Sequence, residues 1–351
     1  MTLAATIGLR RGTLDLQVQI DVAPGELLAL LGPNGSGKTT VLRCLAGLDA
    51  VETGRIMIDE LVVDDPAQGV FVEPERRPIG LVFQEYLLFA HMTVLENVAY
   101  GLRARKTPKD VARRAAREWI DRLGLSEYAD ERPRALSGGQ AQRAALARAL
   151  ATHPRVLLLD EPLAALDAGT RSAVRRDLRR HLGSFDGMRM LVTHDPVDAY
   201  ALADRVAILD RGRVVQVGTL AEVTAHPKSR YVAELVGLNL VSGNVRDGVL
   251  VTGAGANVVI ADAPSGAAFA VIRPHSIALE RHHSPGSSVR NVWRGTVAEV
   301  DRLGDRVRVG VDGIIPLTAE ITAAALDALA LRPGDEIYAS VKATDIDVYQ
   351  A

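Results

Sequence analysis

The chain has 351 residues, a net charge of −2 and 48% hydrophobic residues, enough for two folded domains with cores of their own. The near-neutral charge gives no field that favours nucleic acid, and no apolar run approaches the ~20 residues of a membrane-spanning helix. Cys44 is the single cysteine, which excludes an internal disulfide, and the N-terminus lacks the basic-then-apolar order of a signal peptide. We therefore expect a protein of the cytoplasm.

A glycine-rich segment follows a short apolar run near the N-terminus. Residues 29–31 predict a buried strand, and the apolar spacing over 39–48 predicts a helix, with Gly-Pro-Asn-Gly-Ser-Gly-Lys-Thr between them. In this setting the glycines let backbone N–H groups wrap around a polyphosphate, Lys38 reaches the β- and γ-phosphates, and Thr39 can ligate Mg²⁺. The alternative is an ordinary glycine turn. The predicted ATP-binding residues are Gly32, Pro33, Asn34, Gly35, Ser36, Gly37, Lys38, Thr39 and Thr40.

Two features lie between this segment and the next motif. Gln84 ends the apolar run 79–83, where its amide can contact Mg²⁺ and water or merely end a strand. The basic stretch from Arg103 to Arg117 is compatible with nucleic acid or lipid binding. Glu118 and Asp121 nearby favour ordinary intrahelical ion pairs on a solvated face, and we predict an exposed helix surface.

Residues 136–140, Leu-Ser-Gly-Gly-Gln, predict a second anion-binding helix start. Ser137 has the character of an N-cap, and Gly138 and Gly139 open the predicted helix 140–151 with bare backbone donors. Because the glycine-rich loop already supplies the phosphate contacts of one nucleotide site, a second anion-binding helix start suggests a head-to-tail pair of chains sharing two ATP molecules. The alternative is a plain capping turn, although a Gly-Gly pair is a poor helix start.

Carboxylates and a histidine follow two further strand-like runs. Residues 156–159 predict a buried strand that ends in Asp160, which suits the Mg²⁺ shell, and Glu161, which suits a base that polarises water. His194 follows the run 190–193 and can hydrogen-bond a γ-phosphate. Asp167 can bridge to a second subunit or cap the helix that starts near Gly169. Taken singly, the carboxylates are better explained as a strand cap and His194 as part of a surface turn, and the phosphate loop earlier in the chain is what favours the catalytic interpretation.

In this fixed order the motifs of residues 1–236 resemble the nucleotide-binding subunit of an ABC transporter. Gly32–Thr39 is similar to the Walker A loop, Gln84 to the Q-loop, 136–140 to the signature, 156–161 to Walker B, 165–167 to the D-loop and His194 to the switch histidine. The resemblance implies an α/β P-loop ATPase domain with a helical subdomain, which uses ATP and Mg²⁺. The implied metal ligands are Thr39, Gln84 and Asp160, and the implied catalytic residues are Glu161, His194 and Gln84.

The same resemblance implies how the chain assembles. In the implied homodimer, ATP held by Lys38 of one chain is clasped by the other chain, and residues 84–100 receive a coupling helix from a membrane permease, served in turn by a substrate-binding protein. The residues that act in trans are Ser137, Gly138, Gly139, Gln140 and Asp167. The implied location is the cytoplasmic face of the plasma membrane. One departure is that residues 1–30 hold no aromatic residue to stack on adenine, so Arg10, Arg11 or aliphatic contacts replace it.

After Gly237 the hydrophobic pattern changes from helical spacing to short alternating segments. Residues 237–286 predict a β-rich connecting segment and linker. The segment 287–351 predicts a small all-β barrel, with strands at 295–300, 306–311, 314–317 and 336–343 around a helix at 322–331. Its phrases at 288–291, 303–309 and 339–344 resemble the Mop-like barrel, an OB-like TOBE domain of importer ATPases, although Val289 replaces the usual alanine.

In that family the barrel pairs with a copy of itself and can hold molybdate or tungstate. Ser288, Arg290 and Lys342 are the candidate donors to such a dianion, and the alternative is that they satisfy the barrel's own backbone and interface. The sequence thus predicts the ATP-hydrolysing subunit of a molybdate or tungstate importer. Alternatives are a sulfate, iron, polyamine or sugar importer, a soluble oxyanion sensor or store with a vestigial ATPase, and a soluble ABC ATPase acting on nucleic acid.

Overall fold

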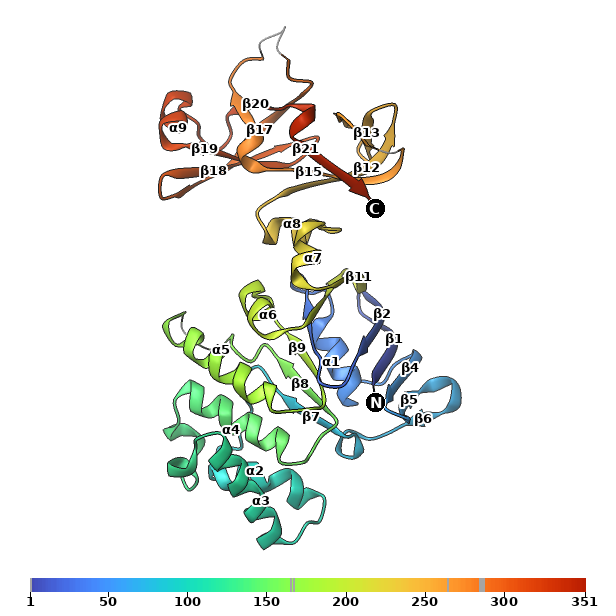
Figure 1. Cartoon of the computed structure of the whole chain (residues 1–351), viewed down its shortest axis with the longest axis vertical. Coiled ribbons are helices and arrows are strands. Elements are labelled where there is room, and N and C mark those ends of the chain that lie inside the picture. Colours follow the sequence, from blue (N-terminus) through green and yellow to red (C-terminus); the bar gives the residue numbers. More distant parts are fainter. Residues whose placement is uncertain (1, 165, 167, 264, 284–287) are drawn as a thin grey trace. The chain divides into compact units, whose positions relative to one another are not determined.

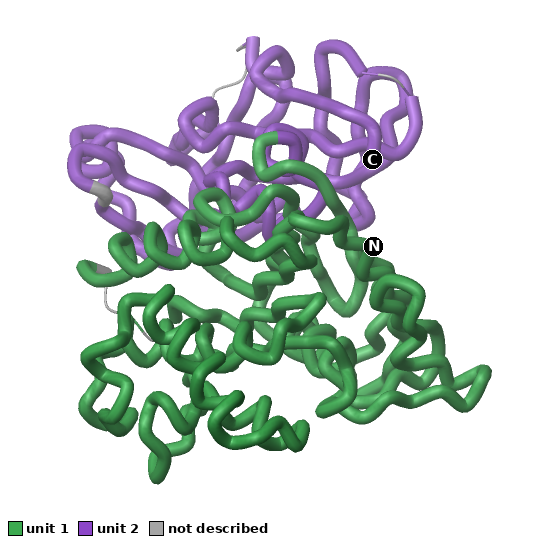
Figure 2. The backbone as a smooth tube through the Cα atoms, turned by 60° about the horizontal axis from the view of Figure 1, so that its bottom comes forward, with its two compact units in different colours: residues 1–221 green, residues 222–351 purple. Residues whose placement is uncertain are grey.

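The computed structural model describes residues 2–164, 166, 168–263, 265–283 and 288–351. It divides into two compact units, unit 1 (1–221) and unit 2 (222–351), coloured separately in Figure 2. The sequence-based domain boundaries at 236/237 and 286/287 stay predictions. Among the described residues no helix is both long and apolar enough to cross a membrane.

Unit 1 is built on a mixed sheet of eleven strands in the order β6-β5-β4-β1-β2-β11-β10-β3-β9-β8-β7 (Figure 1). The strands are β1 (Leu3–Arg11), β2 (Leu14–Val22), β3 (Leu27–Leu31), β4 (Thr53–Ile58), β5 (Leu61–Asp65), β6 (Val70–Phe71), β7 (Ile79–Val82), β8 (Val156–Asp160), β9 (Met188–Val192), β10 (Arg205–Asp210) and β11 (Arg213–Gly218). From β10 to β7 all neighbours are parallel, so the ends of β3, β8 and β9 meet at one edge. These three strands are buried at every position, as their continuous apolar runs predict.

Helices cover both faces of the parallel strands. They are α1 (Lys38–Ala46), α2 (Val94–Ala104), α3 (Lys109–Arg122), α4 (Gly138–Leu150), α5 (Ala168–Gly183) and α6 (Pro196–Leu202). Helix α1 packs in one core with alternate residues of β3 and β8, and α2 to α5 pack in a second core on the opposite face. Helices α2, α3 and α4 gather beyond the β7 edge (Figure 1). The phosphate loop therefore begins in the middle of a rigid, doubly covered sheet.

Unit 2 is mostly β-structure. Helix α7 (Leu220–Ala225) crosses the division between the units, and α8 (Arg230–Leu235) follows it. The remaining elements are β12 (Asn239–Arg246), β13 (Val249–Thr252), β14 (Asn257–Val259), β15 (Gly266–Ile272), β16 (Ala278–Glu280), β17 (Asn291–Leu303), β18 (Arg306–Gly313), β19 (Leu317–Thr322), α9 (Ala323–Leu329), β20 (Glu336–Val341) and β21 (Ile346–Gln350).

These strands form two five-stranded sheets, β14-β13-β12-β15-β21 and β16-β20-β17-β18-β19, which share one hydrophobic core. The predicted strand at 314–317 is wrong. Ile314 lies in a bend and is 52% exposed, Pro316 has no N–H to give to a ladder, and the strand instead runs from Leu317 to Thr322. The predicted helix and the three other predicted strands of this segment are present as α9, β17, β18 and β20.

Candidate functional site

The glycine-rich loop joins the end of β3 to the start of α1, as predicted. Gly32 is required by close approach, because a Cβ there would lie 2.1 Å from the carbonyl oxygen of Leu209 on β10. Gly37 has a φ of 106° and serves as the N-cap of α1, which has no side-chain cap. The first backbone N–H groups of α1 are therefore left for a ligand, and an anion is what they favour.

Lys38 is buried against this loop. Its Nζ donates hydrogen bonds to the carbonyl oxygens of Gly32, at 2.9 Å, and Pro33, at 3.0 Å. Burial lowers the pKa of Lys38, whereas the nearby carboxylates of Glu161 and Asp160 act to raise it. The two carbonyl oxygens thus hold the ammonium of Lys38 on the loop, with two acidic groups nearby.

Asp160 ends β8 and has the chemistry of a metal ligand. Burial raises its pKa, and the charge of Glu161 adds to this, while a hydrogen bond from Thr39 and the charge of Lys38 oppose it. Its Oδ1 is buried and makes no hydrogen bond to any described residue. A buried carboxylate oxygen without a donor, beside a threonine hydroxyl, fits a hard cation such as Mg²⁺.

Glu161 brings the three predicted catalytic residues together. Asp160 pairs with Val192 across β8 and β9, so Glu161 lies beside the end of β9, just before His194. His194 Nδ1 is 3.1 Å from Glu161 Oε2, and Gln84 Nε2 donates to the same oxygen at 3.5 Å. Because a carboxylate only accepts, Nδ1 of His194 carries the proton in this contact. The side chain of Gln84 therefore contacts Glu161. The backbone of Glu161 lies in the left-handed region, with a φ of 44°.

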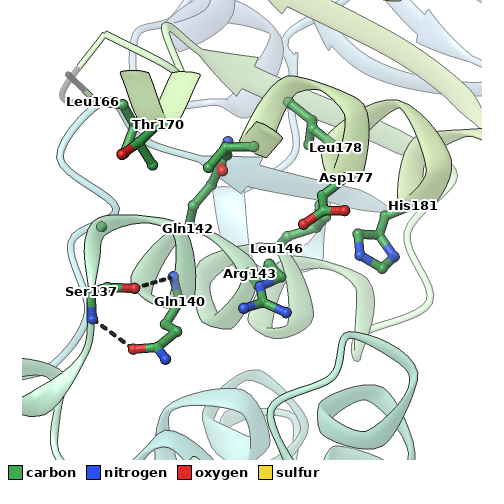
Figure 3. Close-up of a pocket in the computed structure, with 13 residues that line it drawn as sticks. Ser137, Gln140, Gln142, Arg143, Leu146, Leu166, Thr170, Asp177, Leu178 and His181 are labelled. Carbon is green, nitrogen blue, oxygen red and sulfur yellow. Dashed lines mark hydrogen bonds between the residues drawn. The ribbon is translucent and has the colours of Figure 1, made fainter. Parts of the chain in front are cut away.

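The signature segment forms a separate site at the start of α4 (Figure 3). Ser137 caps the helix in a reciprocal capping box: Gln140 N donates to Ser137 Oγ at 3.4 Å, and Ser137 N donates to Gln140 Oε1 at 2.7 Å. A cavity of about 370 Å³ between α4 and α5 is lined by Gly138, Gly139 and residues such as His181, but by none of the described residues of the phosphate loop. This cavity is therefore distinct from the described residues of the chain's own phosphate loop. Asp167 and Ala165 lie outside the described residues.

Two side chains that sequence reasoning missed hold the segment after Glu161. Tyr86, in the loop after Gln84, donates its hydroxyl to the carbonyl oxygen of Pro162 at 3.2 Å. Gln142 of α4 donates its Nε2 to the same oxygen at 3.1 Å, and both side chains are buried. One carbonyl next to Glu161 therefore joins the loop after Gln84 to the signature helix.

Arginines fasten the flanking loops. Arg148 of α4 donates to the carbonyl oxygens of Tyr86, at 2.8 Å, and Leu87, at 2.7 Å, in a turn where both residues have positive φ. On the other side, Arg171 of α5 pairs with Asp195, the residue after His194, at 3.2 Å. Arginine forks suit carbonyls and carboxylates, but their targets are distant in the sequence and leave no local pattern.

Arg77 is a fully buried arginine that the sequence analysis did not identify. Its Nη1 donates to the carbonyl oxygens of Cys44 and Leu45, both at 2.8 Å, and its Nη2 contacts Asp64 at 3.2 Å. It thereby satisfies the last carbonyls of α1, the helix whose first turn belongs to the predicted phosphate site. Its position directly before Pro78 and the run 79–83 was the only signal in the sequence.

In unit 2 the structure brings two of the three candidate oxyanion residues to one place. Asn291 pairs with Val341, so Arg290 and Lys342 lie just beyond this pair, at the same end of β17 and β20. Ser288, Arg290 and Lys342 are exposed. Asn291 is buried instead, and its side chain exchanges two hydrogen bonds with the backbone of Val259, which fixes this end of the strand.

Comparisons with known proteins agree with this geometry. The ABC transporter family model matches residues 16–164, and the TOBE domain model matches residues 287–348. The molybdenum import ATP-binding protein ModC of Mycobacterium tuberculosis (strain ATCC 25618 / H37Rv) is 40% identical over 364 residues, covering 100% of this chain and 97% of the relative. The molybdate/tungstate import ATP-binding protein WtpC of Pyrococcus horikoshii is 38% identical, covering 95% of each chain.

A sulfate/thiosulfate relative and a solved structure are also similar. The sulfate/thiosulfate import ATP-binding protein CysA of Burkholderia pseudomallei is 41% identical, covering 94% of this chain and 93% of the relative. A dimeric ATP-binding cassette in a post-hydrolysis state, bound to ADP and Pi, superposes with a TM-score of 0.51 at 31% identity, covering 62% of this chain and 98% of its own. The chain therefore belongs to the ABC transporter family, as an ATP-hydrolysing import subunit with a C-terminal TOBE domain.

Proposed function

We propose that the chain energises an importer of tetrahedral oxyanions, with molybdate or tungstate as its cargo. A relative that matches the whole chain is a molybdenum import protein, and the TOBE domain carries exposed basic residues at one end of β17 and β20. Sulfate is the second candidate, because a sulfate/thiosulfate relative has a similar identity of 41% over 94% of the chain. All of these cargoes are oxyanions that a cluster of cationic hydrogen-bond donors can hold.

The proposed chemistry is hydrolysis of the γ-phosphate of ATP. The loop Gly32–Thr40 and Lys38 hold the phosphates, Glu161 accepts a proton from the attacking water, and His194 hydrogen-bonds the γ-phosphate. Thr39, Asp160 and Gln84 are the side chains that would hold Mg²⁺, which neutralises phosphate charge when bound. The observation that supports these roles is that Glu161 lies within 3.1 Å of His194 and 3.5 Å of Gln84, beside the buried Lys38.

The proposed active unit is a homodimer in which two ATP molecules are shared. The signature start of α4 offers Ser137, Gly138, Gly139 and Gln140 to the ATP of the second copy, together with Asp167. This is supported by the cavity at that helix start, because no described residue of the chain's own phosphate loop lines it. In the shared site the Gln140 side chain either gives up its contact with Ser137 N or keeps it and donates to the nucleotide through its Nε2 amide alone.

The proposed membrane partner is a permease, reached through a groove of about 500 Å³ on α2 and α3. The groove is lined by His91, Met92, Glu96, Ala99, Tyr100, Arg103, Lys109 and Arg113. Its mixed apolar and basic lining suits an amphipathic helix with an acidic residue at one end. It borders the loop after Gln84, so a helix seated there contacts the segment that Tyr86 ties to Pro162.

The ATPase role is tested by replacing the proposed base. Glu161→Gln should lower turnover by a factor of about 100–10,000 while ATP binding persists, because an amide accepts no proton from water. Glu127→Gln, an exposed change in the same unit, is the matched control. Wild-type turnover in Glu161→Gln would show that Glu161 is not the base.

The cargo is tested by calorimetric titration of the purified chain with molybdate, tungstate and sulfate. Lys342→Ala should abolish binding of the preferred oxyanion, whereas Arg246→Ala, an exposed change on the other sheet of unit 2, should leave it intact. Preferred binding of sulfate would favour the second candidate. If none of the three anions binds, the Ser288, Arg290 and Lys342 site is wrong and uptake of labelled molybdate and sulfate by a gene-deleted strain decides the cargo.

A further inference from the structure

The helical part of unit 1 carries a concentration of positive charge that ATP binding does not use. Residues 103–122 contain eight basic and three acidic side chains, a net charge of +5, although the whole chain carries −2. The remainder of the protein therefore has a net charge of −7. A local field of opposite sign to the rest of the molecule points to an anionic partner at this place.

Six of these basic residues are exposed and are here called the basic surface: Arg103, Lys106, Lys109, Arg113, Arg114 and Arg117. Within the described part of the chain none of the six side chains makes a hydrogen bond or an ion pair with another residue. Arg105 is excluded from the set because it donates to the backbone carbonyls of Thr152 and Arg77.

The expected intrahelical pairing is absent among the described residues. Glu118 makes no ion pair with the basic residues around it, and Asp121 accepts a hydrogen bond from Ser126 Oγ at 2.5 Å. Asp110, Glu118 and Asp121 lie on the same exposed face and reduce its charge without neutralising it. The basic surface is therefore available to an external anion.

The helix geometry displays these cations together. Ala112, Ala116 and Ile120 bury one side of α3 at a spacing of four residues, and Lys109, Arg113 and Arg117 repeat at the same spacing on the exposed side. Small alanines let α3 lie close against its neighbours, while long basic side chains reach outward. Helices α2 and α3 lie together at one end of unit 1 (Figure 1).

The basic surface continues into the groove proposed for the permease. Arg103, Lys109 and Arg113 line that groove, and Arg113 also belongs to the exposed face of Arg114 and Arg117. A permease helix seated in the groove would bring these cations beside the membrane in which the permease lies. The inference that follows rests on this part of the proposed function.

We propose that the basic surface binds the anionic lipid headgroups that surround the permease. Several lysines and arginines on a helix face are the recognised chemistry for such headgroups, and each one near a charged bilayer contributes about fivefold to partitioning. The contact supplements docking in the groove and orients the helical part of unit 1 against the bilayer.

The test uses the full chain and no permease, so that it is separate from the docking proposal. Sedimentation is measured with vesicles of phosphatidylcholine alone and with vesicles that contain about one third phosphatidylglycerol. The wild type should bind the anionic vesicles, and the binding should fall steeply with added salt. The variant K106E/R114E/R117E, which leaves the lining of the groove intact, should lose at least about 100-fold in partitioning, because each of the three cations contributes the factor above.

A control variant makes the same change in charge elsewhere. R176E/R179E/R180E alters three exposed arginines of α5 and should retain vesicle binding. If the first variant does not fold, K106Q/R114Q/R117Q removes the three charges without reversing them and should lose binding as well. ATP hydrolysis by the isolated chain is measured for every variant and should stay at the wild-type rate, since none of these residues lies in the ATP site.

Several outcomes would overturn the proposal. They are equal binding to the two vesicle types, an equal loss in the control variant, and binding of a short oligonucleotide at the same salt without binding of anionic vesicles. Failure of a permease to copurify, with vesicle binding intact, would count against the groove alone.

Discussion

Replacing the buried Arg77 by methionine should destabilise unit 1 severely. Arg77 is 0% exposed and donates to the carbonyl oxygens of Val72, Cys44 and Leu45, each at 2.8 Å, as well as to Asp64. Methionine fills much of the volume but donates no hydrogen bond. Removing one partner of a buried ion pair costs about 3–5 kcal/mol, because the remaining charge is left uncompensated. For a unit of this size that corresponds to a fall of roughly 6–20 °C in Tm.

The deficit should depend on pH. Burial raises the pKa of Asp64, and Arg77 is the main group that opposes this rise. Without Arg77 the pKa of Asp64 in the folded chain rises further, so the cost of the ionised carboxylate is complete above this folded-state pKa. As the pH falls from the folded-state pKa to the unfolded-state pKa, the folded chain takes up a proton at Asp64 and the cost disappears. Arg77→Met should therefore be more destabilising at pH 8 than at pH 5.

The assay uses the two tryptophans of the chain. Trp119 lies in unit 1 and Trp293 in unit 2, so a Trp293→Phe background lets fluorescence report on unit 1 alone during urea unfolding. Arg76→Met, an exposed change at the preceding residue, is the matched control. If the two variants unfold with free energies within about 0.5 kcal/mol of each other, the buried network contributes little and the reasoning is refuted.

Three further predictions concern the groups around the ATP site. Asp160→Asn should stabilise the nucleotide-free protein by about 1–3 kcal/mol at pH 8, because it removes a buried negative charge, one oxygen of which has no donor. Since burial raises the pKa of Asp160, the gain should shrink as the pH falls through the folded-state value, which thermal unfolding can follow. Tyr86→Phe and Gln142→Met should each cost only about 0.5–1.5 kcal/mol, but the double variant should cost more than their sum, because Pro162 then loses both donors. Arg148→Met should speed hydrogen exchange in the loop after Gln84, since two carbonyls lose their donors.

Each of these has a clear contrary result. An unchanged or lower unfolding midpoint for Asp160→Asn at pH 8 would mean that the carboxylate is well satisfied without metal. Additive costs for the two single changes at Pro162 would mean that the donors act independently. Hydrogen exchange at wild-type rates in Arg148→Met would mean that the turn is stable without the hydrogen bonds from Arg148. Arg134→Met, an exposed change just before the signature segment, is the control for the last experiment.

The parts of the ATP site that the sequence predicts are those encoded in continuous stretches. The loop after β3, the carboxylates after β8 and the histidine after β9 each follow a buried apolar run, and parallel strands bring such ends to one edge. Their meeting at Glu161 follows from this topology. The roles assigned to Glu161 and His194 stay predictions until the variants are measured.

The supporting contacts could not be predicted in the same way. Tyr86 and Gln142 reach Pro162 from 76 and 20 residues away, and Arg77 reaches Cys44 across 33 residues. Each is a side-chain contact with a backbone carbonyl, which places no constraint on the local pattern of hydrophobic residues. The strand at 314–317 is predicted wrongly for a different reason, because here the local composition itself is misleading. Ile-Ile-Pro-Leu has the composition of a strand, but Pro316 delays the ladder until the following residue.

The shared acceptor at Pro162 gives the site a form of redundancy. A carbonyl oxygen has two lone pairs, and here one accepts from Tyr86 in the loop after Gln84 and the other from Gln142 of helix α4. Either donor alone keeps the oxygen hydrogen-bonded, so the contact from Tyr86 can break while the contact from Gln142 persists, and the reverse. The segment after Glu161 therefore loses its anchorage at Pro162 only when both hydrogen bonds are broken.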